Sequence, residues 1–213
     1  MAKVFIWDMD GTLIDSYAVI VASMKETYRC FGIDVDADEI RNHVMKYSCG
    51  SFIELMEKRT GKPFADMQDK FNLINEAENK KIGLVKNAGD TLKTLISMGH
   101  RQFIFTHRGP STFEILKKCE ADGLFDEIVT KLNGFKRKPE PDALLYLIDK
   151  YKLDKENTFY VGDRSLDMEC AANAGIGGIL YLPDGSVTEP VGTENYIVKD
   201  LAEIPGLFSE NTD

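Results

Sequence analysis

The chain has 213 residues, of which 43% are hydrophobic and 29% charged, an ordinary balance for a globular protein large enough to bury a core. A net charge of -9 argues against nucleic acid as a partner, because nucleic-acid-binding proteins usually carry a basic stripe. No apolar run approaches the ~20 residues that span a bilayer, no signal-peptide pattern begins the chain, and the four dispersed cysteines favour reduced thiols in a cytoplasmic protein.

Short apolar runs predict strands that are covered on both faces, as in a parallel sheet. They lie at Lys3–Trp7, Gln102–Thr106, Glu127–Thr130, Thr158–Val161 and Ile179–Leu182. Helical patterns alternate with the later strands, at Asp90–Met98, from Ser111 (with capping-box spacing to Glu114) through Cys119, at Pro141–Tyr151 and at Leu166–Ala174. This alternation predicts an α/β fold with a doubly wound, Rossmann-like parallel sheet.

One long segment interrupts the alternation directly after the first strand. Residues 16–82 contain no convincing strand, and their apolar residues recur at helical spacing. We therefore expect a catalytic α/β core made of residues 1–15 and 83–213, with residues 16–82 inserted as a helical cap.

Two acids follow the first strand, in the run Asp8-Met9-Asp10-Gly11-Thr12. Side chains alternate on a strand, so the strand must end near Asp8, and Gly11 then lets the chain turn sharply. Both acids can thus face one spot at the carboxyl edge of the sheet. Two such acids repel each other unless a cation or a shared proton is present, which favours a hard divalent metal such as Mg²⁺.

Further polar residues occur where later strands end. Thr106 closes the second strand, Lys138 precedes a helix, and Asp163 and Asp167 follow the fourth strand. Ligands bind outside the carboxyl ends of parallel strands, so these residues are expected to converge on one crevice.

This ordered set, together with a helical insert after the first strand, resembles the haloacid dehalogenase-like superfamily, in the branch of phosphoglycolate phosphatase and β-phosphoglucomutase. The resemblance covers most of the chain. It implies that Asp8 is the nucleophile that forms an aspartyl-phosphate, and that Asp10 is the general acid and base. Members that dehalogenate lack this second acid, so its presence favours phosphoryl transfer.

The remaining roles carry over in the same way. Thr106 matches the hydroxyl that hydrogen-bonds the phosphoryl group, and Lys138 matches the cation that steadies Asp8 and the phosphoryl charge. Asp163 matches an acidic Mg²⁺ ligand, and Asp167 would support the metal directly or through water. In this family the metal also takes the main-chain carbonyl of Asp10.

Two predicted substrate contacts are specific to this sequence. His107 and Arg108 are bulkier and more basic than the small polar residues often found after the strand-end threonine, and Arg108 would contact phosphate, substrate or a carboxylate of the cap. Ser48 lies in a turn at residues 47–51, where related caps present a specificity loop. We therefore count Arg108 and Ser48 as candidate substrate-binding residues, beside Thr106 and Lys138.

The leading functional prediction is a Mg²⁺-dependent phosphatase that acts on a small phosphorylated metabolite, such as a phosphoglycolate-like acid or a sugar phosphate. A phosphomutase of the β-phosphoglucomutase type is the alternative, although no basic cluster in the cap offers a second phosphate site. A non-enzymatic phospho-acceptor switch fits less well, since such domains are shorter and lack a cap. We expect no nucleic-acid or membrane partner, with a monomer as the default and a dimer left open.

Overall fold

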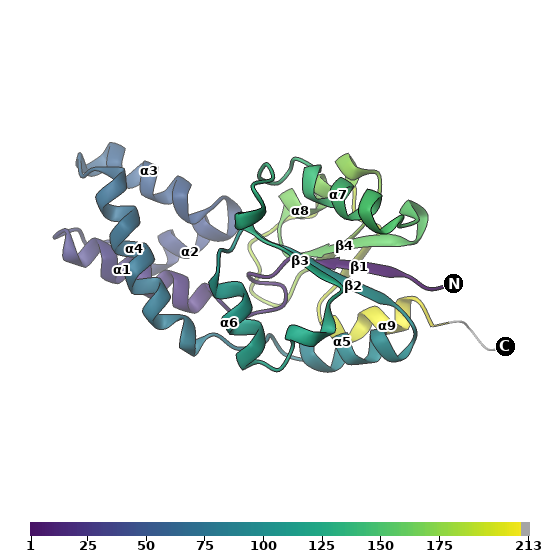
Figure 1. The fold of residues 1–213 in the computed structure, drawn as a ribbon. Helices are drawn as coiled ribbons and strands as arrows, with labels where there is room; N and C mark the ends of the chain where they lie inside the picture. The colour runs from purple at the N-terminus through teal and green to yellow at the C-terminus, as the bar shows by residue number, and fades with distance from the viewer. Residues whose placement is uncertain (210–213) are drawn as a thin grey trace. The chain divides into compact units, whose positions relative to one another are not determined.

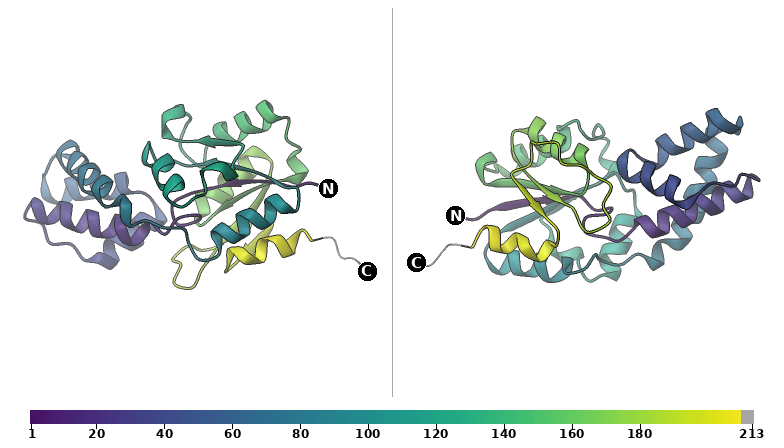
Figure 2. Two further views of the ribbon diagram at one scale, coloured as in Figure 1. Left: turned by 60° about the horizontal axis from the view of Figure 1, so that its bottom comes forward. Right: turned by 180° about the vertical axis from the view of Figure 1, so that it is seen from behind.

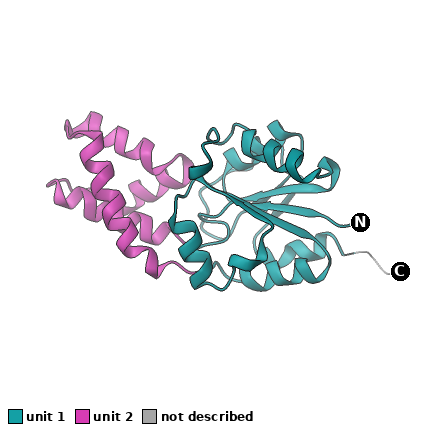
Figure 3. Ribbon diagram, in the orientation of Figure 1, with its two compact units in different colours: residues 1–14, 84–213 teal, residues 15–83 magenta. Residues whose placement is uncertain are grey.

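The computed structural model describes residues 1–209, and these fall into two compact units. One unit contains residues 1–14 and 84–209, and the other contains residues 15–83 (Figure 3). None of the helices in the described part of the chain is both long and apolar enough to cross a membrane.

The first unit is built on a parallel sheet in the strand order β3-β2-β1-β4-β5-β6 (Figure 1). The strands are β1 (Val4–Trp7), β2 (Arg101–Phe105), β3 (Glu127–Val129), β4 (Thr158–Gly162), β5 (Gly177–Tyr181) and β6 (Tyr196–Val198). The order runs outward from β1 in both directions, which is the doubly wound arrangement and confirms the predicted fold class.

Helices cover both faces of this sheet: α7 and α8 lie on one face, with α5 and α9 on the other (Figure 1). Both views of Figure 2 show α9 beside α5. The bounds are α5 (Ala88–Ser97), α6 (Ser111–Lys118), α7 (Asp142–Tyr151), α8 (Ser165–Ala174) and α9 (Ile204–Leu207), with short 3-10 turns at Asn79–Lys81, Asp122–Leu124, Lys131–Asn133, Lys155–Asn157 and Leu201–Glu203.

Alternation along β1 divides the core between these two layers. Ile6 points toward α7 and α8 and packs with Phe103 and Leu147, whereas Phe5 points the other way and its ring meets that of Phe208. All four β1 residues are buried, as expected for a central strand with helices on both faces. Such a strand holds the residue that follows it in a fixed place.

The described structure differs from the sequence expectations at several positions. Each predicted strand is present within two residues, but the short edge strand β6 was not anticipated, and Ile197 in its centre is about half exposed. Helix α6 does begin at Ser111, yet Ser111 is its first residue and Pro110 precedes it without a side-chain cap, so the predicted capping box is wrong. The expected turn at residues 47–51 is shorter, because Cys49 already begins a helix.

The second unit is helical. It contains α1 (Tyr17–Cys30), α2 (Ala37–Lys46), α3 (Cys49–Thr60) and α4 (Phe64–Glu78). Their inward faces share one apolar core, in which Met24, Tyr28 and Phe52 are fully buried. Helix α3 ends at Gly61 in the left-handed conformation, with φ of 70°, which glycine adopts without a steric penalty.

Residues of the first unit pair with each other at the point where the chain leaves for the second unit and returns from it. Ile14 and Leu84 form an antiparallel bridge, and the Val85 amide donates to the Leu13 carbonyl at 3.0 Å. The outgoing and returning segments are therefore neighbours within the first unit.

Candidate active site

The predicted catalytic residues of the first unit occupy one edge of the sheet. Asp8 directly follows β1, Thr106 follows β2 and Asp163 follows β4. These strands are adjacent and parallel, with β1 between β2 and β4, so their carboxyl ends meet. Asp167 reaches the same edge from the first turn of α8, and Lys138 from the loop before α7.

Three buried carboxylates form the centre of this edge. Ligand atoms of Asp8, Asp163 and Asp167 all lie within 4.8 Å of one another. The Oδ2 atom of Asp8 is buried and has no hydrogen-bond partner among the described residues, although a buried acceptor normally has one. Oxygen donors at this spacing, with one unsatisfied, fit the preference of a hard divalent cation. The site can therefore hold a metal ion.

Lys138 neutralises part of this acidic cluster. Its ammonium group forms ion pairs with Asp8 and, at 2.8 Å, with Asp167, and its side chain is 0% exposed. The rings of Phe105 and Tyr160 lie 5.1 and 5.0 Å from the same nitrogen, within the range of cation–π attraction. The cation is thus fixed beside the carboxylate that the sequence predicts to be the nucleophile.

Burial sets the electrostatics of this pair. Desolvation raises the pKa of Asp8 to about 6, with Lys138 opposing the rise and Asp167 adding to it. Burial alone would lower the pKa of Lys138, but the carboxylates of Asp167 and Asp8 outweigh it and the pKa is raised. At neutral pH Asp8 is therefore mostly ionised and Lys138 is protonated, which is the state that a carboxylate nucleophile requires.

The main chain of Lys138 is held by His107, a contact that the sequence did not reveal. The Lys138 amide donates to Nε2 of His107 at 3.0 Å. Desolvation and the nearby positive charge of Lys138 lower the pKa of His107 to about 3, so the imidazole is neutral and Nε2 is free to accept. A basic residue after the strand-end threonine was noticed in the sequence, but spacing could not connect it to a residue 31 positions away.

Two small residues complete the acidic cluster and were also missed. The Thr12 hydroxyl donates to Asp163 at 3.1 Å and so orients this carboxylate. Thr12 stands in the same run as Asp8 and Asp10, which was the available signal. A Cβ atom at Gly162 would lie 2.4 Å from Cβ of Asp167, so only glycine lets this carboxylate approach the end of β4.

Thr106, Arg108 and Asp10 form a second group in the same unit. The buried Thr106 hydroxyl accepts from the Arg108 amide at 3.1 Å. The Arg108 guanidinium binds the Asp10 carboxylate, with Nε 3.1 and 3.2 Å from its two oxygens. Asp10 contributes no carboxylate to the acidic triad, and the sequence did not predict its pairing with Arg108.

Ser48 lies in the other unit, residues 15–83. Its hydroxyl caps α3 by accepting from the Ser51 amide at 3.0 Å. The side chain thus has a local structural task, and substrate contact by Ser48 stays a prediction.

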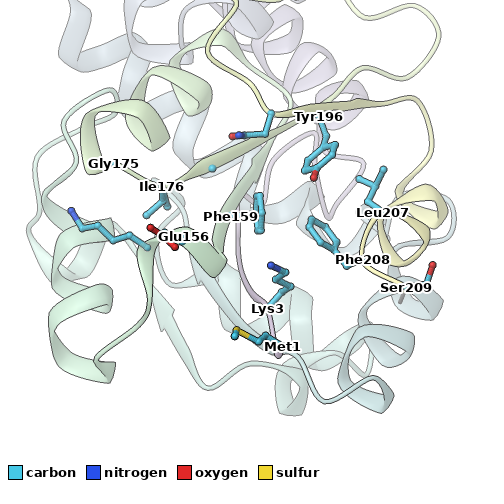
Figure 4. Close-up of a pocket in the computed structure, with 13 residues that line it drawn as sticks. Met1, Lys3, Glu156, Phe159, Gly175, Ile176, Tyr196, Leu207, Phe208 and Ser209 are labelled. Carbon is cyan, nitrogen blue, oxygen red and sulfur yellow. The ribbon is translucent and has the colours of Figure 1, made fainter. Parts of the chain in front are cut away.

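A cavity of about 680 Å³ lies at the opposite, amino edge of the sheet (Figure 4). Lys3, Phe159, Tyr196 and Phe208 are among its lining residues, and none of the residues predicted for the site lines it. This cavity and the buried acids therefore occupy opposite ends of the same strands.

Comparison with known proteins agrees with this architecture. The family described as haloacid dehalogenase-like hydrolase matches residues 5–180. A putative pyrophosphatase from Caldanaerobacter subterraneus is 27% identical, with 82% of this chain and 79% of that protein covered. A phosphoglycolate phosphatase from Vibrio cholerae is 25% identical, with 81% of each chain covered.

Two solved structures extend the comparison. A hydrolase from Streptococcus pneumoniae is 31% identical, with a TM-score of 0.64, 85% of this chain covered and 94% of that chain. A predicted phosphoglycolate phosphatase from Haemophilus somnus has a TM-score of 0.84 at 21% identity, with 97% of each chain covered. The second likeness supports the fold.

Proposed function

Because the chain belongs to the haloacid dehalogenase-like hydrolase family and is a phosphatase of that family, we propose that it hydrolyses a small phosphorylated metabolite through an aspartyl-phosphate on Asp8, with Mg²⁺ as its metal. The observation that carries the proposal is the buried Asp8 carboxylate. Lys138 binds its Oδ1, while its Oδ2 has no hydrogen-bond partner among the described residues. One oxygen is thus held and the other is available to attack phosphorus.

The metal has an identifiable set of ligands. Asp8, Asp163 and Asp167 would hold Mg²⁺, and the family resemblance adds the main-chain carbonyl of Asp10. When bound, the ion would supply positive charge to the phosphoryl oxygens, where negative charge is concentrated in the transition state. Lys138 is the second source of positive charge and needs no metal to be in place.

The remaining residues serve the two halves of the reaction. An oxygen of Asp8 forms a bond to phosphorus while the leaving oxygen keeps the electron pair of its broken bond and takes a proton from Asp10. Water then attacks the phosphorus of the aspartyl-phosphate, its proton passes to Asp10, and the Asp8 carboxylate is restored. The Thr106 hydroxyl, which already accepts one hydrogen bond, has its own proton to donate to a phosphoryl oxygen.

Residues 15–83 are proposed to act as the cap of this enzyme and to select the leaving group. The support is their insertion immediately after the loop that carries Asp8 and Asp10. Relatives named phosphoglycolate phosphatase and pyrophosphatase favour small anionic phosphates as the substrate class. We expect the protein to be active as a monomer.

The direct test measures phosphate release from phosphoglycolate, pyrophosphate and a set of sugar phosphates, in Mg²⁺ and in EDTA. We expect release in Mg²⁺ only, and none from Asp8→Asn. Asp149→Asn is the matched control, because Asp149 lies exposed on α7 and forms a surface ion pair with Lys152 at 2.8 Å. Folded, metal-loaded protein that releases no phosphate from any substrate would contradict the proposal, and so would an Asp8→Asn variant with retained activity.

A further inference from the structure

The Asp10 carboxylate is bound by Arg108 through both of its oxygens. Nε of Arg108 lies 3.1 Å from Oδ1 and 3.2 Å from Oδ2, and Nη2 also donates to Oδ1. The two side chains come from loops 98 residues apart, after β1 and after β2. Two-point contact between a planar guanidinium and a carboxylate fixes orientation as well as distance.

Arg108 is itself held at several points. Its amide donates to the Thr106 hydroxyl at 3.1 Å, and its carbonyl accepts from the Lys131 amide at 3.1 Å. Its Nη1 lies 3.3 Å from the hydroxyl of Ser111, the first residue of α6. The Arg108 side chain is 6% exposed, whereas that of Asp10 is 25% exposed. Of the pair, the arginine is the fixed member and the aspartate is the member that it orients.

The pairing also bears on what Arg108 does in the reaction. A basic residue beside a phosphoryl site invites the interpretation that it binds the substrate. Yet the edge of the guanidinium formed by Nε and Nη2 faces Asp10, and Nη1 faces Ser111. An arginine that left Asp10 to bind phosphate would release a carboxylate that it now holds in a partly buried place, which costs free energy.

We propose that Arg108 is a positioning residue that acts on the reaction through Asp10, by fixing the Asp10 carboxylate for proton transfer, and that it does not bind the phosphoryl group. The inference rests on the proposed function, because the position of Asp10 matters only if Asp10 transfers protons. Proton donors and acceptors must be placed within hydrogen-bond reach of the reacting oxygen, and such placement is a large part of their effect.

The first measurement compares an alkyl phosphate with an activated aryl phosphate in Arg108→Met. Both contain the same phosphoryl group, but only the alkyl leaving oxygen depends strongly on a proton from Asp10. We expect the single-turnover rate of leaving-group release to fall about tenfold or more for the alkyl phosphate. For the aryl phosphate, the fold-loss in this rate should be several times smaller. Equal losses with both substrates would overturn the inference.

Inhibition by inorganic phosphate separates the two roles of Arg108 directly. If Arg108 acts only through Asp10, the inhibition constant for phosphate stays within about twofold in Arg108→Met, since a loss of 0.4 kcal/mol or less corresponds to that factor. A tenfold or greater weakening would show that Arg108 binds the phosphoryl group, and would refute the inference.

A double-mutant cycle gives an independent answer. Asp10→Ala, Arg108→Met and the double variant are compared by single-turnover release from the alkyl phosphate. We expect the double variant to be no slower than Asp10→Ala, because the effect of Arg108 requires Asp10. Losses that multiply would mean that the two residues act separately.

Controls separate failure of the inference from failure of the fold or of the proposed function. Arg101→Met removes an exposed arginine paired with Asp126 and is expected to leave both substrates unaffected. Arg108→Lys keeps the charge but not the two-point geometry. It should therefore also lose more activity with the alkyl phosphate than with the aryl phosphate, although the difference should be smaller than in Arg108→Met. This second variant provides the test if Arg108→Met does not fold. Wild-type protein that releases no phosphate, or a fully active Asp8→Asn variant, would refute the proposed function itself.

Discussion

The two edges of the sheet contain similar parts in different surroundings. At the amino edge, the Lys3 amide donates to His100 at 3.2 Å and the Lys3 ammonium binds Asn157 near the rings of Phe159 and Phe208. At the carboxyl edge, the Lys138 amide donates to His107 at 3.0 Å, and its ammonium lies near two aromatic rings as well. Each edge therefore combines a lysine, a histidine acceptor and aromatic rings.

What differs is the group that binds the ammonium and the depth at which it does so. Lys3 is partly exposed and binds a neutral amide, whereas Lys138 is fully buried and lies between Asp8 and Asp167. A buried ion pair contributes little to stability in comparison with apolar packing, because desolvation offsets the attraction. The comparison teaches that histidine–lysine contacts can belong to ordinary packing, and that buried, mutually dependent charges distinguish the edge at which we propose the chemistry takes place.

The largest expected effect is on turnover and is confined to the carboxyl edge. Asp8→Asn should lower phosphate release by at least about a thousandfold, because the amide cannot attack phosphorus. Phe208→Ala, which enlarges the amino-edge cavity, should leave turnover unchanged. Steady-state rates with one substrate test both variants, and a large loss in Phe208→Ala would break the comparison.

The next effect is on stability. Lys138→Met, measured in EDTA, should lower the free energy of unfolding by about 3–5 kcal/mol, because it leaves buried carboxylates without their cation. Lys3→Met should cost less than about 1 kcal/mol, as is usual for partly exposed polar contacts. Urea titrations of the two variants provide the measurement. Equal costs would mean that the two lysines are in equivalent environments.

Metal binding should further distinguish the carboxyl edge of the sheet from the amino edge. At a Mg²⁺ concentration of about one hundred times Kd, the ion should stabilise the folded chain by about 2.7 kcal/mol, since it binds the folded state alone. Asp163→Asn should abolish most of this increase in thermal stability. Asp154→Asn, which changes the residue that caps the 3-10 turn before β4 at the amino edge, should change the baseline stability but not the response to Mg²⁺. Melting curves with and without Mg²⁺ measure each response.

The last effect concerns pH. The pKa of His107 is lowered from 6.5 to about 3, chiefly by desolvation, so below pH 6.5 the unfolded chain binds a proton that the folded chain does not. Stability should therefore decline as pH falls from 6.5 toward 3, and His107→Gln should weaken this decline. The pKa of His100 is lowered in the same direction, also chiefly by desolvation, but the shift is smaller, so His100→Gln should change the slope less. Unfolding curves across this pH range measure how the free energy of unfolding of each variant depends on pH, and equal slopes for the two variants would contradict the prediction.

Sequence reasoning succeeded where a local pattern determines the outcome. The apolar runs located β1 to β5 within two residues, because a strand covered on both faces needs continuous apolar side chains. The short strand β6 was missed because it has three residues and Ile197 is half exposed, so it has neither length nor a buried pattern. A periodic apolar pattern indicates which side chains are buried, and an edge strand of this kind buries few side chains.

The candidate site was predictable to a similar degree. The convergence of Asp8, Lys138 and the acids after β4 followed from the rule that parallel strands align their carboxyl ends. The contacts of Thr12 and His107, and the pairing of Arg108 with Asp10, depend on side-chain directions in loops. A linear sequence carries no information about these directions until the loops have folded.

The bridge between Ile14 and Leu84 has a consequence for engineering the chain. Bridged residues in neighbouring strands lie about 5 Å apart, a gap that a two-residue hairpin turn spans. The 69-residue block between them could thus be excised and its ends rejoined by an Asn-Gly turn, or replaced by another folded module whose termini lie close together. The described sheet and its two helical layers would remain intact, which makes this junction a natural splice point for exchanging the inserted helical block.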